Sequence, residues 1–135
     1  MSQENVELVR RGFRAFETGD RTAFMALLHP EVVWYPAMEL LLEQSSYHGP
    51  EAVCRLLFEE IPSVLEGFTS ELLGVHDLGG DAVLAVVKFK GRAVSAGMTV
   101  EQVFGQVFRA RDGEALEMRS YPSKAEALEA VELRE

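Results

Sequence analysis

The sequence predicts an α+β fold, in which three or four helices pack on one face of a curved, mostly antiparallel sheet. One observation is the spacing of apolar residues, which is three or four in the first half of the chain and two from residue 68 onward. The other is Asp112-Gly113, which separates the alternating runs 98–110 and 114–121 and therefore predicts a hairpin. Helices followed by an antiparallel meander are typical of the α+β class.

Two helices are expected before residue 30. The first covers residues 3–17, and Gly19 follows its end. Its apolar stripe consists of Val6, Val9, Phe13 and Phe16. Asp20 then caps a short second helix that extends through Leu28, because Pro30 stops it.

A strand, an ambiguous segment and a third helix follow. Residues 31–35 are β-branched and aromatic, so a short strand is expected there. Residues 36–49 are ambiguous, because Leu40-Leu41-Leu42 fits either an apolar loop over a cavity mouth or a helical turn. Gly49-Pro50 opens the third helix, since proline suits the first helical position. The buried stripe of this helix is expected to be Cys54, Leu57, Phe58 and Ile61.

Strands and a last helix are expected in the second half of the chain. The period of two predicts strands over 68–75, 81–90, 98–110 and 114–121. Gly79-Gly80-Asp81 turns the chain between the first two strands. Ser123-Lys124-Ala125-Glu126 matches a capping box and predicts a short helix through Ala130.

Composition excludes several classes of function. The net charge of -9 argues against binding to nucleic acid or to an anionic membrane surface. The longest apolar run, 82–87, is too short to span a bilayer, and the N-terminus lacks the layout of a signal peptide. The three histidines have no ligand spacing, so neither a metal nor a cofactor is expected. Cys54 is the single cysteine, and we expect it to be a structural thiol. A single cysteine also fits a cytoplasmic protein. The length predicts one domain, residues 1–135.

The hairpin predicts one wall of a small-molecule cavity. If its two-residue turn pairs the strands directly, Gln106 lies opposite Arg119, and Phe104 lies opposite Tyr121. A face that mixes aromatic rings with a few polar groups is typical of such a wall. A three-residue turn with a bulge after Asp112 would instead send one strand's set to the other face.

The candidate site residues come from this face and from the segment before the third helix. The candidate ligand-binding residues are Trp34, Tyr47, His48, Gln102, Phe104, Gln106, Arg119 and Tyr121. The candidate acid–base groups are His48, Glu117 and Tyr121. Alternatively, His48 packs at the start of the third helix, and Arg119 forms an ion pair with Glu117.

The opposite face of the hairpin predicts a subunit contact. It carries Val103, Val107, Leu116 and Met118. Both faces are too apolar for contact with water, and the helices suffice to cover one of them. We therefore expect a homodimer through the sheet, related by a two-fold axis.

Several pieces of the sequence, in this order, carry a resemblance to a known family. They are Glu4-Asn5-Val6-Glu7-Leu8-Val9-Arg10-Arg11, Phe16 with Gly19-Asp20, His29-Pro30-Glu31-Val32-Val33-Trp34, Tyr47-His48-Gly49, Arg111-Asp112-Gly113, and Tyr121 with Ala125-Glu126-Ala127-Leu128-Glu129-Ala130. The chain resembles the SnoaL-like branch of the NTF2-like superfamily over nearly its whole length. The resemblance implies a conical α+β roll, usually dimeric through the sheet. Its cavity serves isomerases, cyclases, epoxide hydrolases and non-catalytic binders, so fold alone does not select an activity.

Two classes of function therefore stay open. The first is a small-molecule-binding protein with an enclosed apolar pocket for a ring-bearing organic ligand. The second is a polyketide-cyclase-like or ketosteroid-isomerase-like enzyme that uses acid–base proton transfer. An isomerase of that kind needs a carboxylate in the cavity. Because Asp77, Asp81 and Asp112 are expected at turns or strand ends, the sequence slightly favours the binding protein.

Overall fold

The structure, a computed structural model, describes residues 2–36 and 44–134 of the chain. Within this part of the chain the strands form one six-stranded sheet. The strands are β1 (Leu28–Tyr35), β2 (Tyr47–His48), β3 (Leu65–Asp77), β4 (Ala82–Ala93), β5 (Thr99–Arg111) and β6 (Glu114–Tyr121). Their order is β2-β1-β6-β5-β4-β3, with β1 parallel to β6 and the other neighbours antiparallel. The predicted curved, mostly antiparallel sheet is confirmed.

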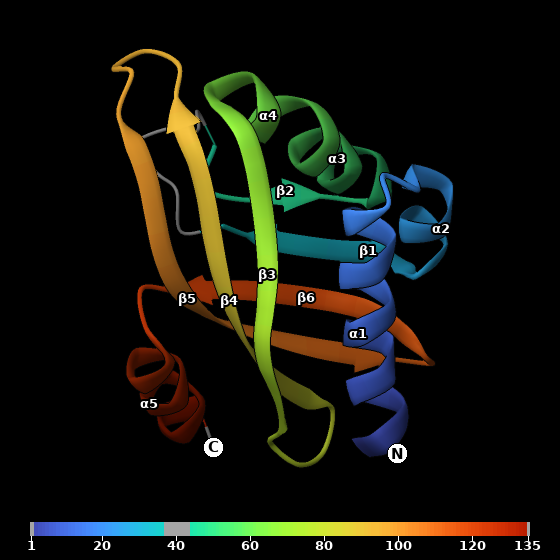
Figure 1. Cartoon of the computed structure of the whole chain (residues 1–135). Helices are drawn as coiled ribbons and strands as arrows, with labels where there is room; N and C mark the ends of the chain where they lie inside the picture. The colour runs from blue at the N-terminus through green and yellow to red at the C-terminus, as the bar shows by residue number, and fades with distance from the viewer. Residues whose placement is uncertain (1, 37–43, 135) are drawn as a thin grey trace.

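Helices cover both faces of this sheet to different extents, so the expectation that all helices pack on one face is wrong. They are α1 (Ser2–Glu17), α2 (Arg21–Ala26), α3 (Pro50–Arg55), the π-helical turn η1 (Leu56–Glu60), α4 (Ile61–Val64) and α5 (Lys124–Arg134). The segments α3, η1 and α4 follow one another without a gap. Together with α1 and α2 they fill the inner side of the bent sheet, whereas α5 lies on the outer side beside β5 and β6 (Figure 1). No helix of the described part is long and apolar enough to cross a membrane.

The predicted helix caps are confirmed. The backbone N–H of Ala23 donates to Oδ1 of Asp20 at 3.0 Å, which satisfies a free donor in the first turn of α2. The backbone N–H of Glu126 donates to Oγ of Ser123 at 3.1 Å, as expected for a capping box. Helix α5 continues beyond Ala130, where the sequence analysis ended it.

The boundary between α2 and β1 differs from the prediction. Helix α2 ends at Ala26, and Leu28 already belongs to β1. Leu28 pairs with Ala115 of β6, and this contact between distant segments overrides the local helical pattern. Pro30, which has no N–H, lies where the pairing of β1 with β6 is interrupted. The ambiguous Leu40-Leu41-Leu42 lies outside the described residues.

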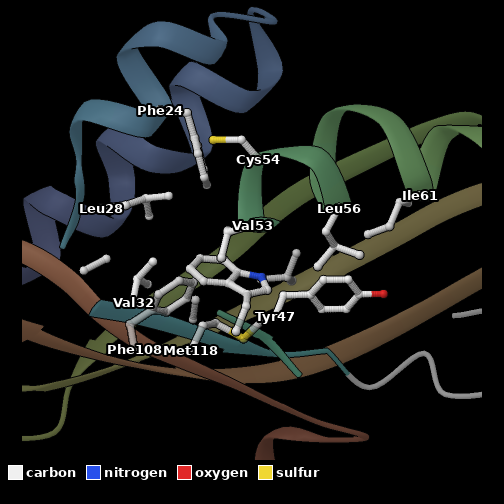
Figure 2. Close-up of a cluster of buried hydrophobic side chains, with 14 of the residues drawn as sticks. Phe24, Leu28, Val32, Tyr47, Val53, Cys54, Leu56, Ile61, Phe108 and Met118 are labelled. Atoms are coloured by element: carbon white, nitrogen blue, oxygen red, sulfur yellow. The ribbon is translucent and has the colours of Figure 1, made fainter. Parts of the chain in front are cut away.

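The main hydrophobic core lies between the inner helices and the inner face of the sheet. Three residues of the inner helices are completely buried, namely Val53 and Cys54 of α3 and Leu56 of η1. Figure 2 shows Val53 and Leu56 pointing down toward the sheet, where Phe108 and Met118 lie. Cys54 and Ile61 of the predicted stripe are buried, whereas Leu57 and Phe58 are only partly buried.

A smaller core lies between the outer face and α5, and it corrects the predicted subunit-facing set. Val107 is buried against Ala127 and Val131 of α5, so this helix already covers it. Met118 lies in the main core on the inner side. Val103 remains 42% exposed, and Leu116 is partly exposed. The four residues therefore do not form one apolar face.

Candidate functional site

The site depends on the register of the β5–β6 hairpin. Arg111 pairs with Glu114, and both turn residues have positive φ, 54° at Asp112 and 78° at Gly113. The predicted two-residue turn is therefore confirmed. The pairing of β5 with β6 nevertheless shifts at Leu116, three residues after Gly113.

A β-bulge at Leu116 causes this shift. Ala110 still pairs with Ala115, but Arg109 pairs with Glu117, so Leu116 is an extra residue on β6. Because side chains alternate along a strand, one extra residue moves every later side chain of β6 to the other face. Gln106 consequently pairs with Ser120, and Val107 pairs with Arg119.

The predicted common face of the hairpin is therefore wrong. Gln106 and Phe108 share the inner face with Met118 and Ser120. The other set, Glu117, Arg119 and Tyr121, lies on the outer face. The bulge that was considered after Asp112, as the alternative to direct pairing, lies instead at Leu116, inside β6. As expected for such a bulge, the two sets of side chains lie on opposite faces.

The inner face borders a cavity between the sheet and the helices. Its volume is about 70 Å³, counted as the space open to the centre of a water molecule. A single water requires about 10–15 Å³ in this measure, so the cavity has room for more than one water. Most lining residues are apolar, and the rings among them are Phe13, Phe16, Phe24, Trp34, Phe68, Phe89 and Phe108. The polar lining residues are Asn5, Ser70, Asp81, Gln106 and Ser120.

Gln106 is the buried polar group of this cavity. The residue as a whole is only 5% exposed. In the described part of the chain its side chain makes one hydrogen bond, from Nε2 to Oγ of Ser120, and the distance is a long 3.4 Å. A carboxamide offers two donors and an acceptor oxygen with two lone pairs. Most of the hydrogen-bonding capacity of Gln106 is therefore left for a molecule in the cavity.

Trp34 forms the aromatic side of the cavity. It is 6% exposed and packs edge-on against Phe108, with ring centroids 5.7 Å apart and an interplanar angle of 73°. Trp34 also packs edge-on against Phe24, at 6.2 Å and 68°. Edge-to-face packing is a favourable arrangement for aromatic rings and fixes their orientation.

The outer-face groups satisfy one another. Nε of Arg119 donates to Oε2 of Glu117 at 3.2 Å, which is the ion pair considered as the alternative role of Arg119. The guanidinium of Arg119 also lies 3.9 Å from the ring centre of Tyr35. His48 is exposed on β2, where Nε2 lies 3.1 Å from Oγ of Ser46. Tyr121 packs into the small core beneath α5.

The sequence-derived candidates thus separate into groups. Trp34 and Gln106 line the cavity. Tyr47 is buried beside Trp34, and Phe104 is buried against Phe89, but neither borders the cavity. Gln102 has the inner-face register but is exposed. The remaining candidates, His48, Glu117, Arg119 and Tyr121, lie on the outer side.

Sequence reasoning missed four polar lining residues. Direct pairing of the two strands would put Ser120 on the face opposite to Gln106, and only the bulge brings the two residues together. Ser70 has the inward register of β3, which the period of two could have indicated. Asn5 and Asp81 come from segments that meet only in the folded chain. Asp81 is half exposed, and its carboxylate accepts from Nη1 of Arg109 at 2.9 Å.

The titratable groups of the helical side have structural roles. Burial raises the pKa of the Cys54 thiol, in keeping with the expected structural thiol. The hydrogen bond to Glu59, at 2.6 Å, raises the pKa of the Arg21 guanidinium and ties α2 to η1. No group of three or more His, Cys, Asp or Glu side chains that could hold a metal ion occurs in residues 2–36 and 44–134.

Comparisons with solved structures show that other proteins share this fold. An NTF2-like protein from Burkholderia thailandensis E264 matches with a TM-score of 0.79 and 21% identity, over 94% of this chain and 96% of the other. TerC, co-crystallised with polyporic acid, matches with a TM-score of 0.75 and 21% identity, over 96% and 98%. RV0760c from Mycobacterium tuberculosis, in complex with estradiol-17beta-hemisuccinate, matches with a TM-score of 0.71 and 19% identity, over 87% and 92%. At these identities the likeness shows the fold alone.

The sequence comparisons are more specific. No functionally curated protein matches this chain significantly. The family model of the SnoaL-like domain matches residues 9–118, which is most of the chain. The chain therefore belongs to the SnoaL-like domain family, within the NTF2-like fold.

Proposed function

We propose that this protein binds a small, uncharged, ring-bearing organic molecule in the cavity beside Trp34, with Gln106 and Ser120 hydrogen-bonded to an oxygen of the ligand. The observation that carries the proposal is the carboxamide of Gln106, which makes a single long hydrogen bond within the described residues although the residue as a whole is only 5% exposed. A buried polar group without good partners costs stability, so such a group points to an absent partner. A ligand hydroxyl or carbonyl would supply that partner.

The preference for an uncharged ligand follows from the lining. Among the described lining residues Asp81 is the charged one, and Arg109 already pairs with it. Bringing an unpaired charge into an apolar cavity is strongly unfavourable. The arginine that the sequence offered for a ligand anion, Arg119, pairs with Glu117 on the outer face.

Two proteins of the same fold support ligand binding in general. TerC was co-crystallised with polyporic acid, and RV0760c was crystallised with estradiol-17beta-hemisuccinate. Acid–base catalysis has less support in this chain. The groups suggested for it, His48, Glu117 and Tyr121, do not border the described cavity.

The test compares p-cresol with benzoate, because both carry one ring but only p-cresol is neutral at pH 7. We expect p-cresol to raise the melting temperature in a dose-dependent manner, whereas benzoate does not. The variant Gln106→Leu keeps the side-chain volume but loses the hydrogen bond, so the affinity for p-cresol should fall by about 1 kcal/mol in titration calorimetry. The matched control Tyr121→Phe removes an outer-face hydroxyl and should leave the affinity unchanged. If p-cresol does not bind, or binds equally to Gln106→Leu, the proposal is wrong.

We also propose a homodimer through the part of the outer face that α5 does not cover. The support is that Val33, Tyr35 and Leu116 lie there and are partly exposed. Light scattering at micromolar concentration should give roughly twice the chain mass of 15.0 kDa. A monomer that persists at high concentration would contradict this assembly.

A further inference from the structure

A second hollow lies on the outside of the helical layer. This groove has a volume of about 430 Å³ and runs between the end of α1, the segment η1–α4 and the edge strand β3. Its apolar lining is largely aromatic. The ring of Phe16 lies 5.4 Å from that of Phe58 and 5.9 Å from that of Phe68, measured between centroids. All three rings are only partly buried.

The groove and the cavity share a wall that is one residue thick. Phe16, Leu57, Phe68 and Ser70 line both hollows. Each of the four is partly exposed, whereas the core residues around the cavity are buried. A rotation of the side chains of Leu57 and Phe68 is therefore the shortest path between the two spaces.

Leu57 lies in an irregular part of its helix. The N–H of Ile61 donates to the C=O of Leu56, five residues earlier, which widens the turn η1. The physical cause is Pro62, which has no N–H for the C=O of Phe58 and would clash with it in a regular α-helix. Single π-helical turns of this kind are frequent at functional sites.

The groove differs from the cavity in charge. Its charged lining residues, within the described chain, are Glu17 and Glu71, and both are exposed. Lys88 lies opposite Glu71 on β4, but its ion pair is with Glu101, at 3.9 Å. The groove therefore favours a cation and disfavours an anion. Its aromatic rings add an attraction for an ammonium group.

We propose that the groove and the cavity are two halves of one binding site for a hydroxyaryl-alkylamine, whose uncharged phenol end is the part that the cavity binds. The uncharged phenol ring occupies the cavity with its hydroxyl at Gln106, the alkyl chain passes between Leu57 and Phe68, and the protonated amine lies in the groove near Glu17 and Glu71. This inference rests on the proposed function, because the ring end uses the same cavity. It adds the second half of the ligand and the residues that select its charge.

The test uses 4-(4-hydroxyphenyl)butylamine and 4-(4-hydroxyphenyl)butyrate, which share the phenol ring and the chain but differ in terminal charge, with p-cresol as the probe of the cavity alone. We expect calorimetry to show tighter binding of the amine than of the acid, by about tenfold at low salt. The double variant Glu17→Gln with Glu71→Gln should weaken binding of the amine about fivefold and leave p-cresol unchanged. Glu129→Gln, an exposed glutamate of α5, is the matched control and should change neither.

Two outcomes overturn the inference, and they differ. If p-cresol binds but the amine and the acid bind equally, or the double variant binds the amine as the wild type does, the groove is not part of the site and the cavity proposal stands. If neither p-cresol nor the amine binds, the cavity proposal itself has failed. A loss of amine binding in the double variant, with p-cresol binding intact, supports the two-part site.

Discussion

The two faces of the β5–β6 hairpin carry polar groups of opposite kinds. On the inner face, Gln106 and Ser120 are uncharged, and Gln106 is buried while its carboxamide makes a single long bond in the described chain. On the outer face, Glu117 and Arg119 are charged and pair with each other at 3.2 Å. The inner face retains hydrogen-bonding capacity for a ligand, whereas the outer face uses its capacity internally.

A single residue decides which set lies on which face. Without the bulge at Leu116, the alternation would bring Arg119 opposite Gln106 and into the core. A guanidinium there would need a buried counter-charge, which is costly. The bulge instead leaves the charges outside and brings the hydroxyl of Ser120 to Gln106. The comparison suggests that an unused neutral hydrogen-bonding group marks this site better than a cluster of charges does.

The largest effect on stability is expected from removing the inner ring of Trp34. Removing the outer ring of its neighbour Tyr35 is the comparison. Trp34→Ala removes a ring packed against Phe24 and Phe108, so the free energy of unfolding should fall by about 3–5 kcal/mol. Tyr35→Ala, on the outer face of the same strand, should cost about 1 kcal/mol, as is usual away from the core. Urea unfolding measures both. Equal losses would contradict the assignment of the two faces.

A smaller effect is expected where α5 closes the outer face. A Cβ added at Gly105 would lie 2.7 Å from the backbone oxygen of Ser123 and 2.9 Å from Cβ of Ala127. Because the backbone of α5 must then shift, Gly105→Ala should destabilise the fold by about 1–3 kcal/mol.

The matched control for this prediction is Gly12→Ala in α1. The added Cβ would meet only Phe24, at an ordinary 3.9 Å. Alanine favours a helix over glycine by up to about 1 kcal/mol, so this variant should be more stable than the wild type. Thermal or urea unfolding distinguishes the two signs. A stabilised Gly105→Ala variant would mean that α5 does not pack on β5.

The smallest effect concerns pH. Burial raises the pKa of the Cys54 thiol in the folded state above the unfolded value of about 8.5. Above that value the unfolded chain loses the proton while the folded chain keeps it, so the free energy of unfolding decreases as pH rises. Cys54→Ala should show a flatter slope between pH 8 and 10 in urea unfolding. Identical slopes would contradict the burial of this thiol.

Local features of the fold could be predicted from the sequence. The caps at Asp20 and Ser123 and the turn at Asp112-Gly113 each depend on a few neighbouring residues, and all three are confirmed. The family resemblance, which rests on motifs spread over the chain, is also confirmed.

The register of β6 could not be predicted, because it depends on two neighbouring strands at once. Ala115 pairs with Leu28 on one side and with Ala110 on the other, and both pairings are irregular between Ala115 and Glu117. Nothing in the local alternation of residues 114–121 indicates this. The same holds for β2, whose two residues form a strand only because Val33 and Trp34 pair with them.

The most direct measurement is nuclear magnetic resonance of the side-chain N–H groups during a titration with p-cresol. Trp34 is the single tryptophan, so its indole signal is unambiguous, and the carboxamide signals of Gln106 are assigned with Gln106→Leu. Binding in the cavity predicts that the signals of Gln106 and Trp34 shift with one common dissociation constant, while the Nε–H signal of Arg119 stays unchanged. A shift of the Arg119 signal with Gln106 and Trp34 unaffected would contradict it, because the ligand would then bind to the outer face.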